Sequence, residues 1–355
     1  MIAWSSLHAQ VHQTCRSRWI HQIPGPPSFL LPQGSTVLIA VSGGQDSQCL
    51  LRLLVDLQEK WGWHLFCIHC NHRWRPDAEA NAEFVTQLSH QWGIPCIVET
   101  ADQPPASEAA ARQWRYRRFE QVALEQGCTH VVTGHTASDR AETLLYNLLR
   151  GSGANGLQAL TWQRPLGDDI SLVRPLLDVT RAQTAQFCQD YAIPIWEDST
   201  NTDRNYARNR LRLDVLPLLR NYFNPQVDST LAQTAEILTA EVAYLEQAAM
   251  TLMERCVEAD KIQRRRLREA PLALQRRVVR QVLCQRLPVQ PQFDHIEKVV
   301  VLLQAPNRSR TDPFPGGTIA IVKDPWIQFD FLEMPASAQE QLNYRNQEAD
   351  SEESH

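Results

Sequence analysis

The stretch that decides the fold is TVLIAVSGGQDSQCLLRLL, residues 36–54. Its apolar run, residues 37–41, has the length and composition of a buried β-strand. The run stops at SGGQDS, residues 42–47, and apolar residues then return at helical spacing from Cys49 onward. The stretch therefore predicts a strand, a glycine-rich turn and a helix in direct succession.

Strand-like and helix-like segments continue to alternate after this stretch. Further strand candidates are 64–69, 95–99 and 129–133, and helix candidates are 46–60, 77–93, 106–126 and 138–150. Residues 172–196 add LVRPLL, a helix from about Thr180, and IPIW. Alternation at this spacing predicts an α/β fold with a parallel five-stranded sheet and right-handed crossovers.

The pattern changes near residues 210–225, where a long helical region of roughly 226–258 begins. A hairpin-like piece follows, in which PFPGG precedes the strand-rich TIAIV. We expect a smaller, mostly helical domain here. The expected divisions are 1–35, an N-terminal helix and linker; 36–222, a catalytic domain; 223–332, a helical appendage with a small hairpin; and 333–355, a disordered acidic tail.

Composition limits the class of protein. No apolar run approaches the ~18 residues that a membrane-spanning helix needs, and the N-terminus lacks the pattern of a secretory signal. Nine scattered cysteines favour a reducing cytoplasm over a disulfide scaffold. The net charge is −5, yet residues 261–286 hold nine basic residues against one acid. This segment predicts a surface for the RNA backbone, although a solvated helical face would have the same composition.

The turn at residues 42–47 has the chemistry of a phosphate site. Backbone N–H groups at a helix start attract anions, and two glycines let the main chain approach a phosphate closely. Ser42 and Ser47 can add hydroxyl donors, whereas Asp46 suits Mg²⁺. A plain alternative is a Gly-Gly turn with Asp46 as helix cap. Neither the Walker pattern nor the dinucleotide pattern G-x-G-x-x-G is present in the stretch.

The turn resembles the SGGxDS signature of the PP-loop ATP pyrophosphatases. This resemblance implies the adenine-nucleotide-binding, HUP-like sheet of that superfamily, with ATP at the carboxyl ends of the strands. Its members activate a carbonyl oxygen by adenylation. Pyrophosphate leaves first, and a nucleophile then displaces AMP.

Further blocks in the same order narrow the resemblance to the tRNA(Ile)-lysidine synthetases. They are IHCNHRWR (68–75), SEAAARQWRYRRFE (107–120), TGHTASDRAETLLYNLLRGSGANGL (133–157), RPLL (174–177) and WEDSTNTDRNYARNRLRLDVLPLL (196–219). The blocks span about half of the chain, and the last is the most discriminating because other PP-loop enzymes lack it. Thr136, Ser138 and Arg140 depart from the family, which usually has His, Asp and Gln there.

This resemblance implies ATP and Mg²⁺ as cofactors, and an isoleucine tRNA with a CAU anticodon and free L-lysine as partners. No membrane and no obligate protein partner are implied. The C2 carbonyl of the wobble cytidine would be adenylated, and the lysine ε-amine would expel AMP. The resulting lysidine would change decoding from AUG to AUA.

The resemblance and the residue chemistry together assign site residues. The expected catalytic residues are Asp46, Asp139, Glu142, Arg112 and Arg115. The expected ATP contacts are Ser42, Gly43, Gly44, Gln45, Asp46, Ser47 and His135. The expected tRNA or lysine contacts are His72, Arg75, Asp198, Asn201, Arg208, Asn209, Arg212, Arg264, Arg265 and Arg266. Mg²⁺ would lie at Asp46 and Asp139.

Other hypotheses stay open at this stage. Cys67 and Cys70 form C-x-x-C beside two histidines, which would suit zinc or redox chemistry, but buried thiols are the simpler interpretation. A tRNA enzyme that thiolates cytidine would need such a pair near the Arg-Tyr helix, where AAARQWRYRR has no cysteine. A catalytically silent RNA-binding module is the third possibility. Glu142 alone would also suit a helix first turn.

Overall fold

The computed structural model describes residues 4–17, 29–197, 203–204, 207–259 and 261–331. The chain divides into two compact units, with the division between Val242 and Ala243. The sequence pattern predicts the change at 222/223, where the helical pattern begins. The division instead falls inside the single long helix α10 (Val227–Cys256). The acidic tail lies outside the described residues.

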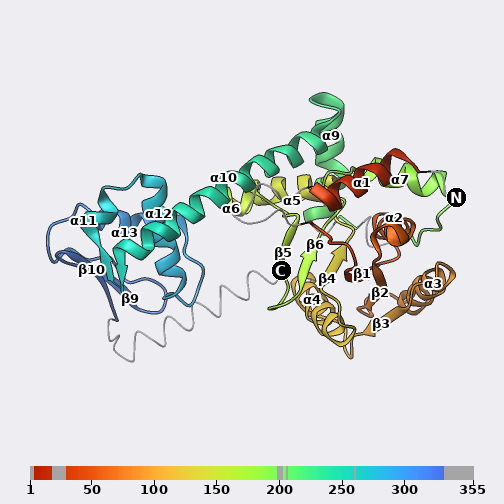
Figure 1. Cartoon of the computed structure of the whole chain (residues 1–355). Helices are drawn as coiled ribbons and strands as arrows, with labels where there is room; N and C mark the ends of the chain where they lie inside the picture. The colour runs from red at the N-terminus through yellow and green to blue at the C-terminus, as the bar shows by residue number, and fades with distance from the viewer. Residues whose placement is uncertain (1–3, 18–28, 198–202, 205–206, 260, 332–355) are drawn as a thin grey trace. The chain divides into compact units, whose positions relative to one another are not determined.

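Unit 1 is built on a six-stranded sheet (Figure 1). In spatial order its strands are β3 (Cys96–Thr100), β2 (His64–Asn71), β1 (Thr36–Ala40), β4 (His130–Thr133), β6 (Ser171–Val173) and β5 (Gln163–Pro165). The first five are parallel, as the alternation of strands and helices predicts. The sixth, β5, is an additional antiparallel strand paired with β6.

Both faces of this sheet are buried. Along β1, Val37 and Ile39 pack into the core shared with α1, α2, α3 and α7, whereas Leu38 packs into the core shared with α4. A strand that is covered on both sides must be apolar throughout, which explains the continuous apolar run of the sequence. The helices of unit 1 are α1 (Ser6–Ser17), α2 (Gln45–Trp61), α3 (Ala78–Gln91), α4 (Glu108–Glu125), α5 (Ala137–Leu149), α6 (Ala154–Leu157), α7 (Arg181–Asp190), α8 (Ala207–Arg210), the π-helical turn η2 (Leu211–Val215) and α9 (Leu216–Tyr222).

Unit 2 combines helices with a small antiparallel sheet. The sheet order is β7 (Val257–Glu258), β8 (Lys261–Gln263), β10 (Trp326–Phe331) and β9 (Thr318–Lys323), so the expected hairpin is extended by two short strands. Helices α11 (Arg264–Arg268), α12 (Leu272–Cys284) and α13 (Phe293–Leu302) complete the unit, which has its own apolar core. Among the described residues, no helix is both long enough and apolar enough to cross a bilayer.

Candidate active site

The glycine-rich turn lies where β1 ends and α2 begins, at the carboxyl edge of the sheet. Its shape is fixed by its own hydroxyls, because the Ser42 N–H donates to Ser47 Oγ (3.2 Å) and Ser47 Oγ donates to the Gly44 carbonyl (2.8 Å). Gly43 has a φ of +93°, and a Cβ there would collide with Asn81 Oδ1. Both the backbone conformation and the crowding therefore require glycine at this position.

Two residues that sequence reasoning missed hold the turn from outside. Asn81 on α3 donates its side-chain amide to the Ser42 carbonyl at 3.1 Å. The Trp196 N–H donates to the Gly43 carbonyl at 3.0 Å. Asn81 lies outside every sequence block quoted above, and Trp196 opens the block 196–219 without a role that the sequence indicates. Both contacts depend on tertiary structure.

A cavity of about 510 Å³ opens beside this turn. It is lined by the turn, the end of β2, the first half of α4, the start of α5 and the segment at α8 and η2. Predicted site residues that line it are Ser42, Gly44, Gln45, Asp46, Ser47, His72, Arg75, Arg112, Arg115, His135, Asp139, Glu142, Arg208, Asn209 and Arg212. Asp198 and Asn201 lie outside the described residues. Arg264, Arg265 and Arg266 belong to unit 2.

Asp46 sits in the first turn of α2 and faces into a polar cluster. Its carboxylate accepts a hydrogen bond from Thr184 Oγ1 and lies 3.8 Å from the Arg181 guanidinium. Burial, and then the charge of Asp139, raise the pKa of the Asp46 carboxyl. Two half-buried carboxylates that disfavour each other's charge form a place where a cation is stabilised.

Asp139 and Glu142 share one arginine. Arg212 donates to Glu142 in a bidentate pair (2.6 and 2.8 Å) and reaches Asp139 Oδ1 at 3.3 Å. Burial raises the pKa of Glu142, and the hydrogen bonds from Arg212 oppose that shift. Arg212 lies in the π-helical turn η2, a feature that is frequent at functional sites and that no sequence pattern indicates.

The three departures from the family pattern all have structural partners. Thr136 caps α5 in a capping box, in which its N–H and hydroxyl both donate to Asp139 Oδ2 at 2.8 Å. Ser138 Oγ accepts the Arg181 N–H at 3.3 Å. Arg140 is buried and donates to Glu236 (2.8 Å) and Thr239 (3.2 Å) on α10. The start of α5 is thus intact without the usual residues.

Helix α4 supplies a cationic wall. Arg112 lies over the Tyr116 ring at 5.0 Å, and Arg164 from β5 lies over the same ring at 4.6 Å. Burial, and the like charges of neighbouring arginines, lower the pKa of Arg112. Arg164 and Tyr116 were not predicted as site residues, and the short β5 gave no signal for Arg164.

His72 and His135, two of the histidines that line the cavity, are held in the neutral form by their surroundings. Burial, together with the charge of Arg174, lowers the pKa of His135 to about 3. Burial, together with Arg115, lowers the pKa of His72 to about 4. Neither can therefore serve as a phosphate-binding cation near neutral pH, but each can donate or accept a hydrogen bond.

The C-x-x-C pair does not form a metal site. Cys67 packs into one core of the sheet and Cys70 against the other. The Cys67 sulfur lies 3.5 Å from the sulfur of Cys96, on the neighbouring strand, and burial raises the pKa of Cys70 to about 12. Within the described residues, no group of three or more His, Cys, Asp or Glu could hold a metal ion by itself. The expectation of largely buried, free thiols is confirmed.

The basic segment 261–286 is mostly engaged within unit 2. Arg264, predicted to contact RNA, is 8% exposed, and its guanidinium donates to the carbonyls of Leu303 and Ala305. That prediction is corrected, because a buried guanidinium with these partners has a structural role. The other tied arginines are Arg266 (to the Arg255 carbonyl), Arg276 (to Glu297), Arg277 and Arg280 (both to Glu246) and Arg286 (over the Phe329 ring).

Comparison with known proteins agrees with this geometry. Residues 15–219 match the model of the PP-loop domain. The U34-tRNA thiolase NcsA from Methanococcus maripaludis has a related fold, with a TM-score of 0.53 and 15% identity over 65% of this chain and 77% of that chain. Fold and site thus define a PP-loop, ATP-utilising enzyme.

The particular family follows from the whole chain. Residues 263–324 match the model described as the TilS substrate binding domain. The tRNA(Ile)-lysidine synthase of Nostoc sp. is 53% identical over 92% of this chain and 97% of its own length. That of Thermosynechococcus vestitus is 50% identical over 92% of both. The chain belongs to the tRNA(Ile)-lysidine synthase family.

Proposed function

We propose that the protein ligates free lysine to C2 of the wobble cytidine in the CAU anticodon of an isoleucine tRNA, with ATP as the energy source. The observation that carries this proposal is that one cavity joins the phosphate-binding turn to the Asp139–Glu142 pair. A nucleotide site and a cation-binding carboxylate pair within one cavity are what an adenylation followed by amine attack requires.

In this proposal the turn and the start of α2 hold the ATP phosphates. Free N–H groups at a helix N-terminus bind anions. Gly43 lets the turn pack closely against Asn81, so that Ser42 and Gly44 line the cavity. The cationic wall of Arg112 and Arg115 faces the same cavity and stabilises the charge that develops as pyrophosphate leaves. Neutral His135 suits a hydrogen bond to the nucleotide.

Asp46 and Asp139 fit a Mg²⁺ ion. Both are carboxylates in one polar cluster, and the charge of Asp139 raises the pKa of Asp46. A bound cation would relieve this repulsion, while phosphate oxygens and water would complete the hard-oxygen coordination that Mg²⁺ prefers. When bound, Mg²⁺ would neutralise phosphate charge.

Lysine would be recognised by Asp139 and Glu142, which already hold a cation, the Arg212 guanidinium. A carboxylate that binds the ε-ammonium can also accept its proton as the amine attacks. The C2–N bond then forms, the bond from C2 to the AMP oxygen breaks, and AMP leaves with the bonding electrons. The target base must leave its stack to enter the cavity.

The decisive experiment is incubation with ATP, Mg²⁺, labelled lysine and the CAU-bearing isoleucine transcript, followed by nucleoside analysis. We expect labelled lysidine, AMP and pyrophosphate, and no product with a methionine transcript. Absence of tRNA-dependent pyrophosphate release would instead support a silent RNA-binding module. Cytidine thiolation is disfavoured because the similar curated proteins are lysidine synthases and because helix α4, which carries Arg112 and Tyr116, has no cysteine; Cys67→Ala and Cys70→Ala should keep lysidine formation.

We also propose a division of labour along the chain. The match of residues 263–324 supports tRNA binding by the predicted appendage 223–332. The cavity of unit 1 supports catalysis by residues 36–222. A cytoplasmic location accords with a tRNA substrate and with nine free cysteines. Fluorescent tagging of the protein in cells would test the location.

A further inference from the structure

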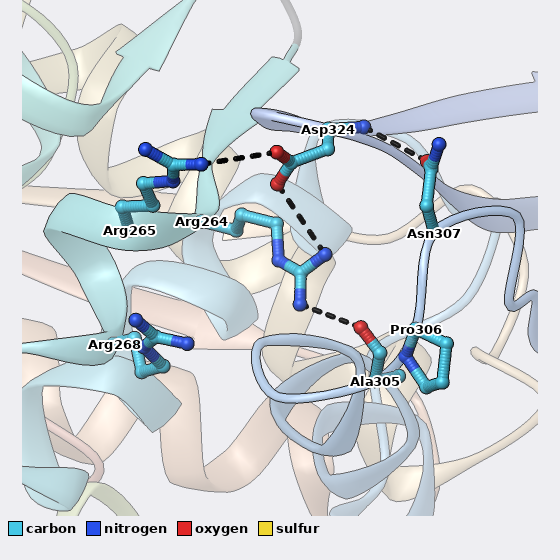
Figure 2. A pocket seen from close by; sticks show the side chains of 7 residues that line it. All are labelled: Arg264, Arg265, Arg268, Ala305, Pro306, Asn307 and Asp324. Carbon is cyan, nitrogen blue, oxygen red and sulfur yellow. Dashed lines mark hydrogen bonds and ion pairs between the residues drawn. The ribbon is translucent and has the colours of Figure 1, made fainter.

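Unit 2 contains a cavity of its own, of about 550 Å³ (Figure 2). Helix α11 lines one side, the segment after α13 lines another, and Asp324, between β9 and β10, lies at the top of the view. The lining residues are Arg264, Arg265, Arg268, Ala305, Pro306, Asn307 and Asp324. The cavity thus holds three arginines against one carboxylate, so it carries an excess of positive charge.

Buried contacts fix the shape of this cavity. Arg264 donates to the carbonyls of Leu303 (3.2 Å) and Ala305 (2.6 Å) and lies 3.5 Å from Asp324. The Asp324 N–H in turn donates to Asn307 Oδ1 at 3.1 Å. A rigid floor of this kind positions the groups above it before any ligand arrives, which reduces the entropic cost of binding.

Two guanidiniums remain available above this floor. Arg265 has a side chain that is 66% exposed and shares Asp324 with Arg264 at 3.3 Å. Arg268 has no carboxylate partner among the residues the structure describes. Asn307 Oδ1 accepts the N–H groups of Arg308 and Asp324, which leaves its NH₂ group to donate. The other arginines of segment 261–286 are tied to internal partners, so the available charge concentrates here.

We infer that this cavity binds a backbone phosphate of the tRNA, with Arg265, Arg268 and the Asn307 amide as donors. The inference rests on the proposed function. Planar guanidiniums bind phosphate oxygens in bidentate fashion, and Asp324 orients one of them. The site contacts no base, so it positions the RNA and contributes affinity without reading sequence.

The test measures the affinity of the full chain for the CAU isoleucine transcript over a range of KCl concentrations. Arg268→Gln should weaken binding roughly tenfold at low salt, the loss of a charged hydrogen-bond donor. It should also reduce the slope of log K against log salt by about one. Arg310→Gln is the matched control, because Arg310 is an exposed arginine of unit 2 that does not line the cavity; we expect less than about a twofold effect.

A variant with the opposite expected effect guards against misfolding. Asp324→Asn removes the negative charge of the one carboxylate that lines the cavity, while the amide oxygen and the backbone N–H keep the hydrogen bonds that orient the arginines. It should tighten tRNA binding about threefold, in the range of an exposed charge interaction. In lysidine formation, Arg268→Gln should raise KM for tRNA and leave kcat and KM for ATP unchanged. Equal effects of Arg268→Gln and Arg310→Gln on tRNA affinity would overturn the inference.

The source of the phosphate is tested separately. If Arg268→Gln changed inhibition by inorganic pyrophosphate but not tRNA affinity, the site would serve a free anion and the inference would be wrong. Failure of the wild-type protein to form lysidine would contradict the proposed function. The RNA affinities would still test this inference, because binding can be measured without turnover.

Discussion

At the residue scale, Gly43 is subject to two constraints, a strained backbone conformation and a crowded Cβ position, and a control variant can separate their effects. Any other residue there would need the left-handed φ of +93°, and its Cβ would collide with Asn81. We expect Gly43→Ala to lower the free energy of unfolding by about 1–3 kcal/mol and to abolish pyrophosphate release. Gly34→Ala is the control, because Gly34 has a similar φ of +74° but open space around it. Urea titration and a pyrophosphate assay measure both effects; equal activity losses in the two variants would contradict the crowding argument.

Arg140 tests whether a departure from the family pattern is structural. It is buried, and its guanidinium is paired with Glu236, which also accepts the Trp162 indole N–H at 2.7 Å. Restoring the family residue, Arg140→Gln, should cost about 2 kcal/mol of unfolding free energy, because Glu236 loses its cation. A double-mutant cycle with Glu236→Gln measures the coupling. Additive losses would show that the pair contributes nothing.

His135 gives the stability a pH dependence. Its pKa is lowered by burial to about 3 in the folded protein, against 6.5 for a free imidazole. Between these two pKa values the unfolded chain binds a proton that the folded protein does not bind. Stability therefore rises with pH between about 3 and 6.5, by up to ~1.4 kcal/mol per pH unit. His135→Gln should flatten the curve of unfolding free energy against pH in this window. An unchanged slope would count against an imidazole that the folded protein keeps neutral.

At the scale of elements, helix α5 presents Asp139 and Glu142 three residues apart, on one face. We expect Glu142→Gln to raise KM for lysine roughly tenfold, because a charged hydrogen-bond partner is lost, while KM for ATP stays unchanged. Steady-state kinetics with each substrate varied in turn would measure this. Leu149→Gln, an exposed change on the same helix, is the control. A rise confined to KM for ATP would indicate instead that Glu142 contacts the nucleotide.

The elements that sequence predicted are those with local signals. The β1–turn–α2 unit follows from apolar periodicity and two glycines, and the five parallel strands follow from repetition of that pattern. By contrast, β5 is the tripeptide QRP, whose pairing is imposed by β6. The π-helical turn η2 differs from an α-helix only in hydrogen-bond register, so composition cannot indicate it.

At the scale of the whole molecule, the sequence predicts the net charge of a segment but not which of its charged side chains are paired. The basic excess of residues 261–286 is evident in the sequence, but its partners, such as Glu246 and Glu297, lie outside that segment. Only the tertiary structure shows which guanidinium groups are paired with these internal carboxylates. The same holds for the division between the two units, because α10 continues through it and leaves no composition change to mark it.

The two carboxylate oxygens of Asp139 have different partners. Oδ2 accepts hydrogen bonds from Thr136, the N-cap at the start of α5, whereas Oδ1 faces Arg212 in the cavity. An asparagine could keep the first bond with its carbonyl while turning an amide toward the second partner. Asp139→Asn would therefore keep the cap of α5 and lose the contact with the cation. We expect this variant to be well folded and inactive.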